Sequence, residues 1–560
     1  MVSLLVMKFP FGRNLKTGTG LKKQFSLAFL LLLIGVLSGC DWWASLSQPK
    51  TDADTSKPTV IVPPDESRNL LKRAIYAQTL ILQPQQLQND QQLPLIQDLY
   101  EGLVRFDKNG AMQGGAAESW QQQDHKVWIF QLRPDLKWSN GEALTAQDFV
   151  QSWYALAAQG KENPLSEYLR FIALENVDKV LSKEYGVEML GIKALDATHL
   201  QLTLSQPIPY LPQMLSHVAL FPQYQGENDG TLVSNGPYHL LYHSQSDLLN
   251  DLLLEKNPFY WNNQRVAFRN VSYHTLQNSD DPSEYDLVQQ PSGIAISPNG
   301  MQLLELPSLC NYYYEFNFRN PRLKQSAVRK AIVAMVSLPE IVSGNVSSNI
   351  DSKNSFESIR ANPKFLPRNL QAQEQEDSWT PTVVEQLLSQ TDVNSRQPLR
   401  LRLTYEQQGI HPQIAERLIR MLSQSDLIQI QAEAVTRQQL LERRAKGDFD
   451  LIQSGWCADY PDPSAFLNIL HSQSANNKMA YHDEKVDALL QQSLQADVTE
   501  PQRLQLYTEI EKIINQEQVV LPLFQYYHRY WIKPDLSGYA SPAVNSGIAS
   551  QDLYRKVSQP

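Results

Sequence analysis

Residues 455–460 combine an indole, a thiol, a carboxylate and a phenol in the sequence Gly-Trp-Cys-Ala-Asp-Tyr. They follow the mostly apolar run 449–452, and this order predicts a short buried strand that delivers polar groups to an edge or cleft. A second thiol, Cys310, opens the aromatic sequence Leu-Cys-Asn-Tyr-Tyr-Tyr-Glu-Phe-Asn, which also predicts a strand. If Cys310 and Cys457 are bridged, the two strands are joined and Asp459 is fixed beside the bridge.

The N-terminus carries the features of an export signal. Basic residues precede the apolar run 25–37, which ends in Leu-Ser-Gly-Cys, and this run is too short for a membrane-spanning helix of roughly 20 residues. Leu-Ser-Gly-Cys resembles the bacterial lipobox, so we expect a signal peptide at 1–39 and a lipid on Cys40. An uncleaved anchor is the alternative, and either outcome holds the protein at a membrane. Asp41 resembles the signal for retention at the inner membrane, and the polar residues that follow predict a tether over 40–67.

The remaining two cysteines are expected to form a disulfide. The chain has three cysteines, and with Cys40 assigned to lipid only Cys310 and Cys457 are left in an oxidising compartment. Two separate buried thiols are the alternative. Neither cysteine lies in a CxxC motif or near a suitably spaced histidine, so we expect no metal site.

Composition and motifs exclude several classes of function. A chain of 560 residues predicts two or three domains, and a net charge of −10 without a basic block argues against nucleic acid. The sequence has no HExxH, GxSxG or P-loop motif, and no convincing Cys–His arrangement. We therefore expect no catalytic residues, no cofactor and no enzyme activity.

Several short motifs follow one another along the chain. The strand-like segment 127–133 precedes LKWSNGEALTAQDFVQSW, in which Asn-Gly predicts a tight turn and Thr145 with Asp148 predicts a helix start. Further motifs are Ser-Asn-Gly-Pro-Tyr at 234–238, Leu-Glu-Lys-Asn-Pro-Phe-Tyr-Trp at 254–261, Val-Arg-Lys-Ala-Ile at 328–332 and the two cysteine segments. In type and order these motifs resemble the solute-binding proteins of peptide ABC importers, over nearly all of the chain from about residue 70 to 554. The paired cysteines within them resemble the oligopeptide-binding branch.

The resemblance implies an α/β fold of the periplasmic-binding-protein-like type II, with two hinged lobes and an additional inserted domain. The implied segments are 68–115, 234–309 and 528–560 for a discontinuous lobe 1, 116–233 for the inserted domain and 310–527 for lobe 2. Both cysteines fall in lobe 2, so a bridge between them would not lock the hinge.

The resemblance also implies a function and a location. The implied protein is a monomeric lipoprotein on the periplasmic face of the inner membrane of a Gram-negative bacterium. It would capture oligopeptides and deliver them to an ABC permease in that membrane. A peptide-sensing or signalling lipoprotein with the same fold is one alternative. A binder of another ligand, such as cell-wall peptides, is the other.

Asp459 matches the family position that receives the amino group of the peptide, since a buried ammonium needs a carboxylate partner. By resemblance, Trp456, Cys457 and Tyr313 match positions that pair with the peptide backbone. Glu315 and Tyr526 resemble pocket-lining positions. A structural role in a strand core remains open for the tyrosines.

The cationic positions for the peptide carboxylate are where the sequence departs from the family. The expected arginine is Gln453, and a lysine of the family appears as Val346. His411 matches a family histidine near the ligand carboxylate. Arg437 falls where the family commonly has an indole, and we hypothesise that it replaces the missing charge.

Overall fold

A computed structural model gives the structure of the protein. It describes residues 69–87, 90–227, 230–246, 249–277, 280–290, 298–343, 356–371, 384–495, 497–539 and 547–556. The expected signal peptide, the lipidated Cys40, the tether and Val346 lie outside the described residues. Among the helices within these ranges, none is both long and apolar enough to cross a membrane.

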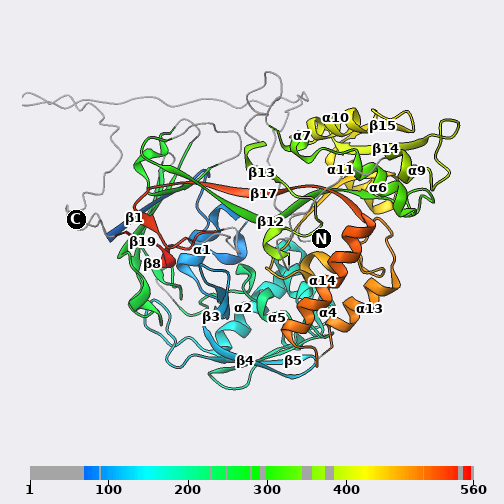
Figure 1. Cartoon of the computed structure of the whole chain (residues 1–560). Coiled ribbons are helices and arrows are strands. Elements are labelled where there is room, and N and C mark those ends of the chain that lie inside the picture. Colours follow the sequence, from blue (N-terminus) through cyan, green and yellow to red (C-terminus); the bar gives the residue numbers. More distant parts are fainter. Residues whose placement is uncertain are drawn as a thin grey trace, which may run out of the picture. The chain divides into compact units, whose positions relative to one another are not determined.

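A mixed sheet of eleven strands is the frame of the described chain (Figure 1). Its strands lie in the order β15-β14-β16-β12-β17-β11-β1-β10-β9-β8, and β13 also pairs with β17. Their bounds are β1 Leu70–Ile75, β8 Tyr238–Ser246, β9 Leu249–Lys256, β10 Asn270–Thr275, β11 Leu287–Gln289, β12 Gln302–Phe316, β13 Ile359–Ala361, β14 Leu399–Glu406, β15 Ile428–Val435, β16 Leu451–Cys457 and β17 Val520–Ile532. The long strands β12 and β17 pair antiparallel and connect the β11–β1 side of the sheet with the β16–β14 side.

A separate antiparallel sheet, in the order β4-β5-β7-β6, is formed within residues 117–203 and includes the strand predicted at 127–133. Its strands are β4 Ala117–Asp124, β5 Val127–Leu132, β6 Ile192–Ala194 and β7 His199–Thr203. Helix α2, Ala146–Gln159, begins at the predicted capping box, in which the carboxylate of Asp148 accepts from the backbone N–H of Thr145 at 2.7 Å. Its Phe149 and Trp153 are fully buried. Two small hairpins pair β2 Val104–Phe106 with β3 Met112–Gly114, and β18 Leu536–Ser537 with β19 Tyr554–Arg555.

Twelve further α-helices are described. They are α1 Leu93–Leu99, α3 Glu167–Phe171, α4 Val177–Leu181, α5 Leu211–Met214, α6 Ser326–Ala334, α7 Leu338–Val342, α9 Val384–Leu388, α10 His411–Leu422, α11 Arg437–Lys446, α12 Ser464–Leu467, α13 Glu484–Ser493 and α14 Glu500–Glu517.

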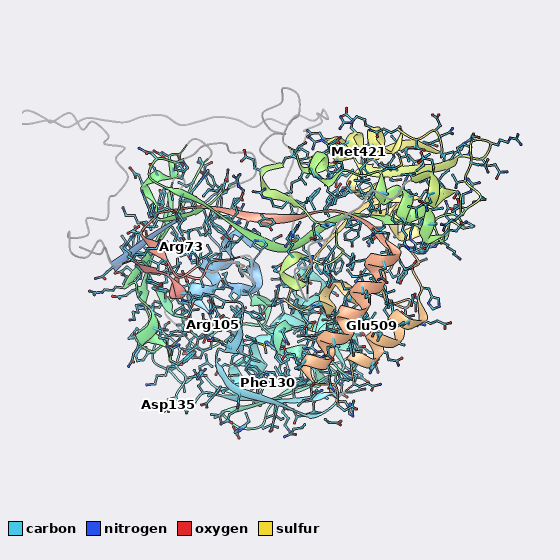
Figure 2. All side chains as sticks on the ribbon, viewed as in Figure 1. Arg73, Arg105, Phe130, Asp135, Met421 and Glu509 are labelled. Carbon is cyan, nitrogen blue, oxygen red and sulfur yellow. A yellow bond between two sulfur atoms is a disulfide. The ribbon has the colours of Figure 1, made fainter. Side chains whose placement is uncertain are left out.

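The buried side chains of the described residues form three large clusters, which divide the chain in much the same way as the expected domains. One draws on residues 103–233 together with Tyr460 and Ala465, one on 71–306 together with 530–553, and one on 312–524. Figure 2 marks Phe130 in the first cluster and Met421 in the third. Each cluster draws mainly on residues expected for one part of the chain, either the inserted domain or one of the two lobes. The boundaries of these parts stay a prediction.

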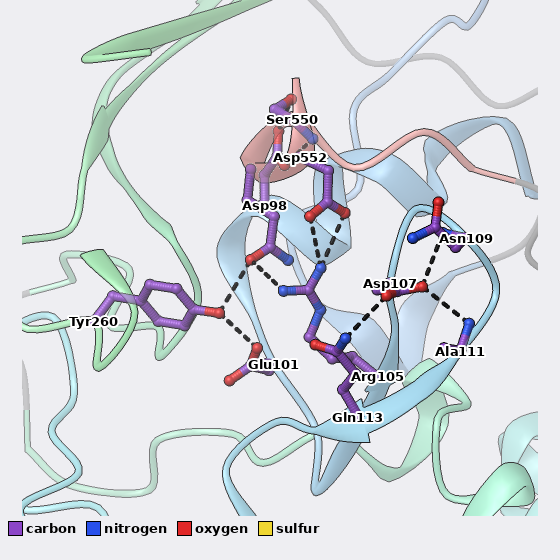
Figure 3. A network of polar contacts seen from close by, with 11 residues as sticks. Asp98, Glu101, Arg105, Asp107, Asn109, Ala111, Gln113, Tyr260, Ser550 and Asp552 are labelled. Carbon is purple, nitrogen blue, oxygen red and sulfur yellow. Dashed lines mark hydrogen bonds and ion pairs between the residues drawn. The ribbon is translucent and has the colours of Figure 1, made fainter. Parts of the chain in front are cut away.

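The segment 547–556 is tied to α1 and the strands beside it by buried polar contacts (Figure 3). The backbone N–H of Ser550 donates to Asp98 at 3.0 Å, and Arg105 pairs with Asp552 at 2.8 Å. Burial raises the pKa of Asp98, although the charge of Arg73 and the hydrogen bonds from Ser550 act to lower it. This end of the chain therefore belongs to the same core as the first strand of the sheet.

Candidate functional site

The disulfide between Cys310 and Cys457 joins β12 to β16, which confirms the predicted bridge. The two strands are antiparallel, with Cys310 opposite Cys457 and Tyr313 opposite Ser454. Gly455 permits their close approach, since a Cβ there would lie 2.8 Å from the backbone oxygen of Asn311. The two cysteine segments therefore lie side by side as adjacent strands.

Most of β16 has a strand partner on one side only. On the side away from β12, β14 pairs with just Leu451 and Ile452 of this strand within the described ranges. Residues 453–456 thus present a backbone edge, and Gly455 is exposed to solvent. An edge of this kind can accept an extended chain through main-chain hydrogen bonds.

Asp459 follows this edge and is partly buried. It lies close to Tyr168 of α3, whose pKa is raised well above its usual value by burial and then by the charge of Asp459. The next residue, Tyr460, is buried and stacks on Tyr210 at 5.6 Å. Asp459 therefore lies where the 451–460 segment meets the core formed by residues 103–233. Tyr168 had no motif around it that could have predicted this contact.

Tyr313 and Glu315 lie two positions apart on β12, and both are fully buried. The carboxylate of Glu315 accepts hydrogen bonds from the guanidinium of Arg444 at 2.6–3.0 Å and from the hydroxyl of Ser454 at 3.1 Å. Tyr313 packs edge-on against Phe365. Because both side chains lie within the core, their contact with a ligand stays a prediction.

His411 begins α10 and contacts the tyrosine that precedes Tyr313. Its Nδ1 lies 3.1 Å from the hydroxyl of Tyr312, and the two rings are stacked. Burial, and then the charge of Arg437, lowers the pKa of His411 to about 4. The imidazole is therefore neutral at pH 7 and supplies no positive charge to this part of the site.

Arg437 contacts a carboxylate of the protein itself. Its Nη1 lies 3.3 Å from Oε2 of Glu406, the last residue of β14. The side chain of Gln453 accepts from the backbone N–H of Glu406 at 2.7 Å. Burial, followed by the charge of Glu406, raises the pKa of Tyr526, which places the two groups near one another. Glu406 was missed by motif reasoning, and its position at the end of an alternating strand is the signal that marks it.

Strands β15, β14 and β16 run parallel, and helices α10 and α11 start just beyond the carboxyl ends of β14 and β15. Glu406, His411 and Arg437 therefore lie at one edge of the sheet, next to the open part of β16. Ligands in α/β proteins commonly bind at this edge. Within the described residues, no group of three or more potential metal ligands is present.

Comparison with known proteins agrees with this architecture. The family described as bacterial extracellular solute-binding proteins, family 5 Middle, matches residues 111–478. The chain belongs to this family. Its fold is therefore the two-lobed α/β fold of family 5, as the motifs predicted.

Relatives of this family 5 protein cover nearly all of the chain. A Haemophilus influenzae protein described as a putative binding protein is 39% identical over 530 residues, which cover 95% of this chain and 97% of the relative. The periplasmic oligopeptide-binding protein OppA of Escherichia coli is 28% identical and covers 84% of this chain and 90% of its own. The unliganded open form of the periplasmic murein tripeptide-binding protein MppA has a TM-score of 0.77 at 25% identity, over 87% of this chain and 97% of its own.

Proposed function

We propose that this solute-binding protein captures oligopeptides in the periplasm and delivers them to an ABC importer of the inner membrane. Family membership and the names of the relatives OppA and MppA support this function. The observation that carries it is the open edge of β16 at residues 453–456, which lies shortly before Asp459 in the chain. A receptor for peptides of varied sequence must bind the groups that all peptides share, and a strand edge with a nearby carboxylate offers partners for these groups.

In this proposal the peptide lies extended along β16. Its backbone pairs with residues that include Trp456 and Cys457, and its ammonium group meets the carboxylate of Asp459. Its far end is directed toward His411 and Arg437. Tyr526 lines that end, while Tyr313 and Glu315 support the strands from the core. The disulfide keeps the position of the binding edge constant when the lobes move.

The export signal completes the proposed role. We propose that Cys40 carries a lipid that holds the monomeric protein at the periplasmic face of the inner membrane, close to its permease. A lipid anchor would raise the local concentration of the protein around the importer. Inhibition of lipoprotein processing, followed by fractionation of membranes, tests this part.

Cell-wall peptides are a second candidate class of ligand, favoured by the likeness to a murein tripeptide-binding protein. They share the free amino group and the peptide bonds, so the proposed edge suits both classes. A sensing role would use the same site and differ only in the partner that recognises the closed form.

Native mass spectrometry of the protein purified under oxidising conditions tests the function. We expect a ladder of masses that correspond to bound peptides, and we expect Asp459→Ala to lose it. Asp448→Ala is the matched control, because Asp448 is an exposed aspartate that pairs with Arg402 away from the edge. An empty protein that also fails to respond to a peptide library in thermal shift would contradict peptide capture.

A further inference from the structure

Glu406 is a buried carboxylate with few hydrogen-bond donors. Its side chain is 9% exposed. Among the described residues its carboxylate accepts one hydrogen bond, from Nη1 of Arg437 at 3.3 Å, and Nε2 of His411 lies 3.9 Å away. A carboxylate can accept about four hydrogen bonds, and a buried charge is costly unless they are made. Glu406 therefore has room for a further donor.

The neighbouring side chains do not supply the further hydrogen bonds that the Glu406 carboxylate can accept. Arg437 is 42% exposed, so water competes for its guanidinium. His411 is neutral at pH 7, and its Nδ1 is engaged with the hydroxyl of Tyr312. The carboxylate of Glu406 is therefore paired only weakly, and at one of its two oxygens.

The two cationic or potentially cationic side chains near this carboxylate come from the first residues of two helices. His411 is the first residue of α10 and Arg437 the first of α11, and both approach Glu406. An arginine side chain at this place favours an anion beside it. Here Glu406 is that anion, so the place where a ligand carboxylate would be expected is already occupied by the protein.

We propose that Glu406 makes this end of the site select a cationic or neutral hydrogen-bond donor of the peptide, such as a basic side chain or an amide, and reject a free carboxylate. This inference rests on the proposed function, in which the peptide amino group lies at Asp459. Residues 453–456 span roughly 10 Å at ~3.3 Å per residue, so the far end of a peptide of about four residues reaches Gln453 and Glu406. A free carboxylate there meets a like charge, whereas a donor completes the hydrogen bonding of Glu406.

Two pools of randomised tetrapeptides test this selectivity, one with free carboxyl termini and one with carboxamide termini. We expect the full protein to bind the amide pool at least about tenfold more tightly in calorimetric titration. In Glu406→Gln this preference should disappear or reverse, because the acid pool gains access to Arg437. The matched control is Glu433→Gln, since Glu433 lies on the adjacent strand β15 and pairs with Arg443 instead.

The outcomes distinguish a failure of the proposed selectivity from a failure of peptide capture. If the acid pool binds the unchanged protein as tightly as the amide pool or more tightly, the selectivity is wrong while peptide capture stands. The same holds if Glu406→Gln and Glu433→Gln shift the preference equally. If neither pool binds the unchanged protein, the proposed function fails and the inference fails with it. The comparison in the unchanged protein needs no variant, so a folding defect in Glu406→Gln leaves the test decisive.

Discussion

Glu315 and Glu406 are both buried carboxylates beside β16, yet their partners differ. The hydroxyl of Ser454 donates to the carboxylate of Glu315, whereas the side chain of Gln453, the preceding residue of β16, accepts from the backbone N–H of Glu406. Glu315 is fully buried and accepts a two-pronged contact from Arg444, which is 17% exposed. Glu406 accepts a single long contact from a half-exposed arginine.

The difference separates a structural charge from one that is available to a ligand. The Glu315 pair has the geometry that compensates for the loss of water, because two nitrogens and a hydroxyl surround the carboxylate. The Glu406 pair lacks this geometry and keeps capacity for a further partner. The number of donors around each carboxylate, rather than burial alone, distinguishes Glu315 from Glu406.

The largest expected effect is on the Glu315 side. Arg444→Ala should lower the free energy of unfolding by about 3–5 kcal/mol, because it leaves a buried carboxylate without its cation. Urea unfolding followed by fluorescence measures this change. The double variant Glu315→Gln with Arg444→Met is the control, and it should recover part of the loss. A decrease of less than ~1 kcal/mol in Arg444→Ala would show that the Glu315 pair is no stronger than the Glu406 pair.

The two regions also differ in how far the sequence predicts them. The disulfide, the strand that leads into Asp459 and the family fold followed from motifs and from the number of cysteines. These features depend on residues that are close in sequence or of a rare type. Arg444 and Glu406 could not be predicted in the same way, because each contacts a residue on another element far along the chain. No spacing rule connects Glu315 with Arg444, which are separated by 129 positions.

The three consecutive tyrosines illustrate the same limit. Alternation along β12 directs Tyr312 and Tyr314 to one face and Tyr313 to the other. All three are nevertheless buried, because the sheet is covered on both faces at this point. Sequence reasoning left core and pocket as alternatives for them, since a strand pattern cannot show what covers each face.

A smaller effect is expected from His411, the neutral neighbour of Glu406. Its pKa is lowered to about 4 in the folded protein and is about 6.5 in an unfolded chain. Between these values the unfolded state binds more protons, so the contribution of His411 to stability is complete above pH 6.5 and is lost as the pH falls toward 4. Between pH 6.5 and 4, the free energy of unfolding of the wild type should fall by about 1–3 kcal/mol more than that of His411→Gln. Urea unfolding at a series of pH values measures both.

Three other histidines, His217, His239 and His528, also have a pKa lowered by burial, and they remain in both proteins. Their effect cancels in the difference between wild type and variant. If the wild type instead gained stability relative to His411→Gln on acidification, the imidazole would be charged and paired with Glu406. Glu406 would then be paired with a cation more nearly as Glu315 is.

The smallest expected effect is on the Glu406 side. Arg437→Ala should change the free energy of unfolding by less than about 1 kcal/mol, because a half-exposed single contact contributes little. The same urea series that is used for Arg444→Ala measures it, with Arg400→Ala on the exposed face of β14 as the control. A loss above ~3 kcal/mol would mean that Glu406 depends on Arg437 as Glu315 depends on Arg444. With the small loss that we expect, Glu406 tolerates the absence of its cation in the free protein, and its carboxylate can exchange Arg437 for a donor group of the ligand.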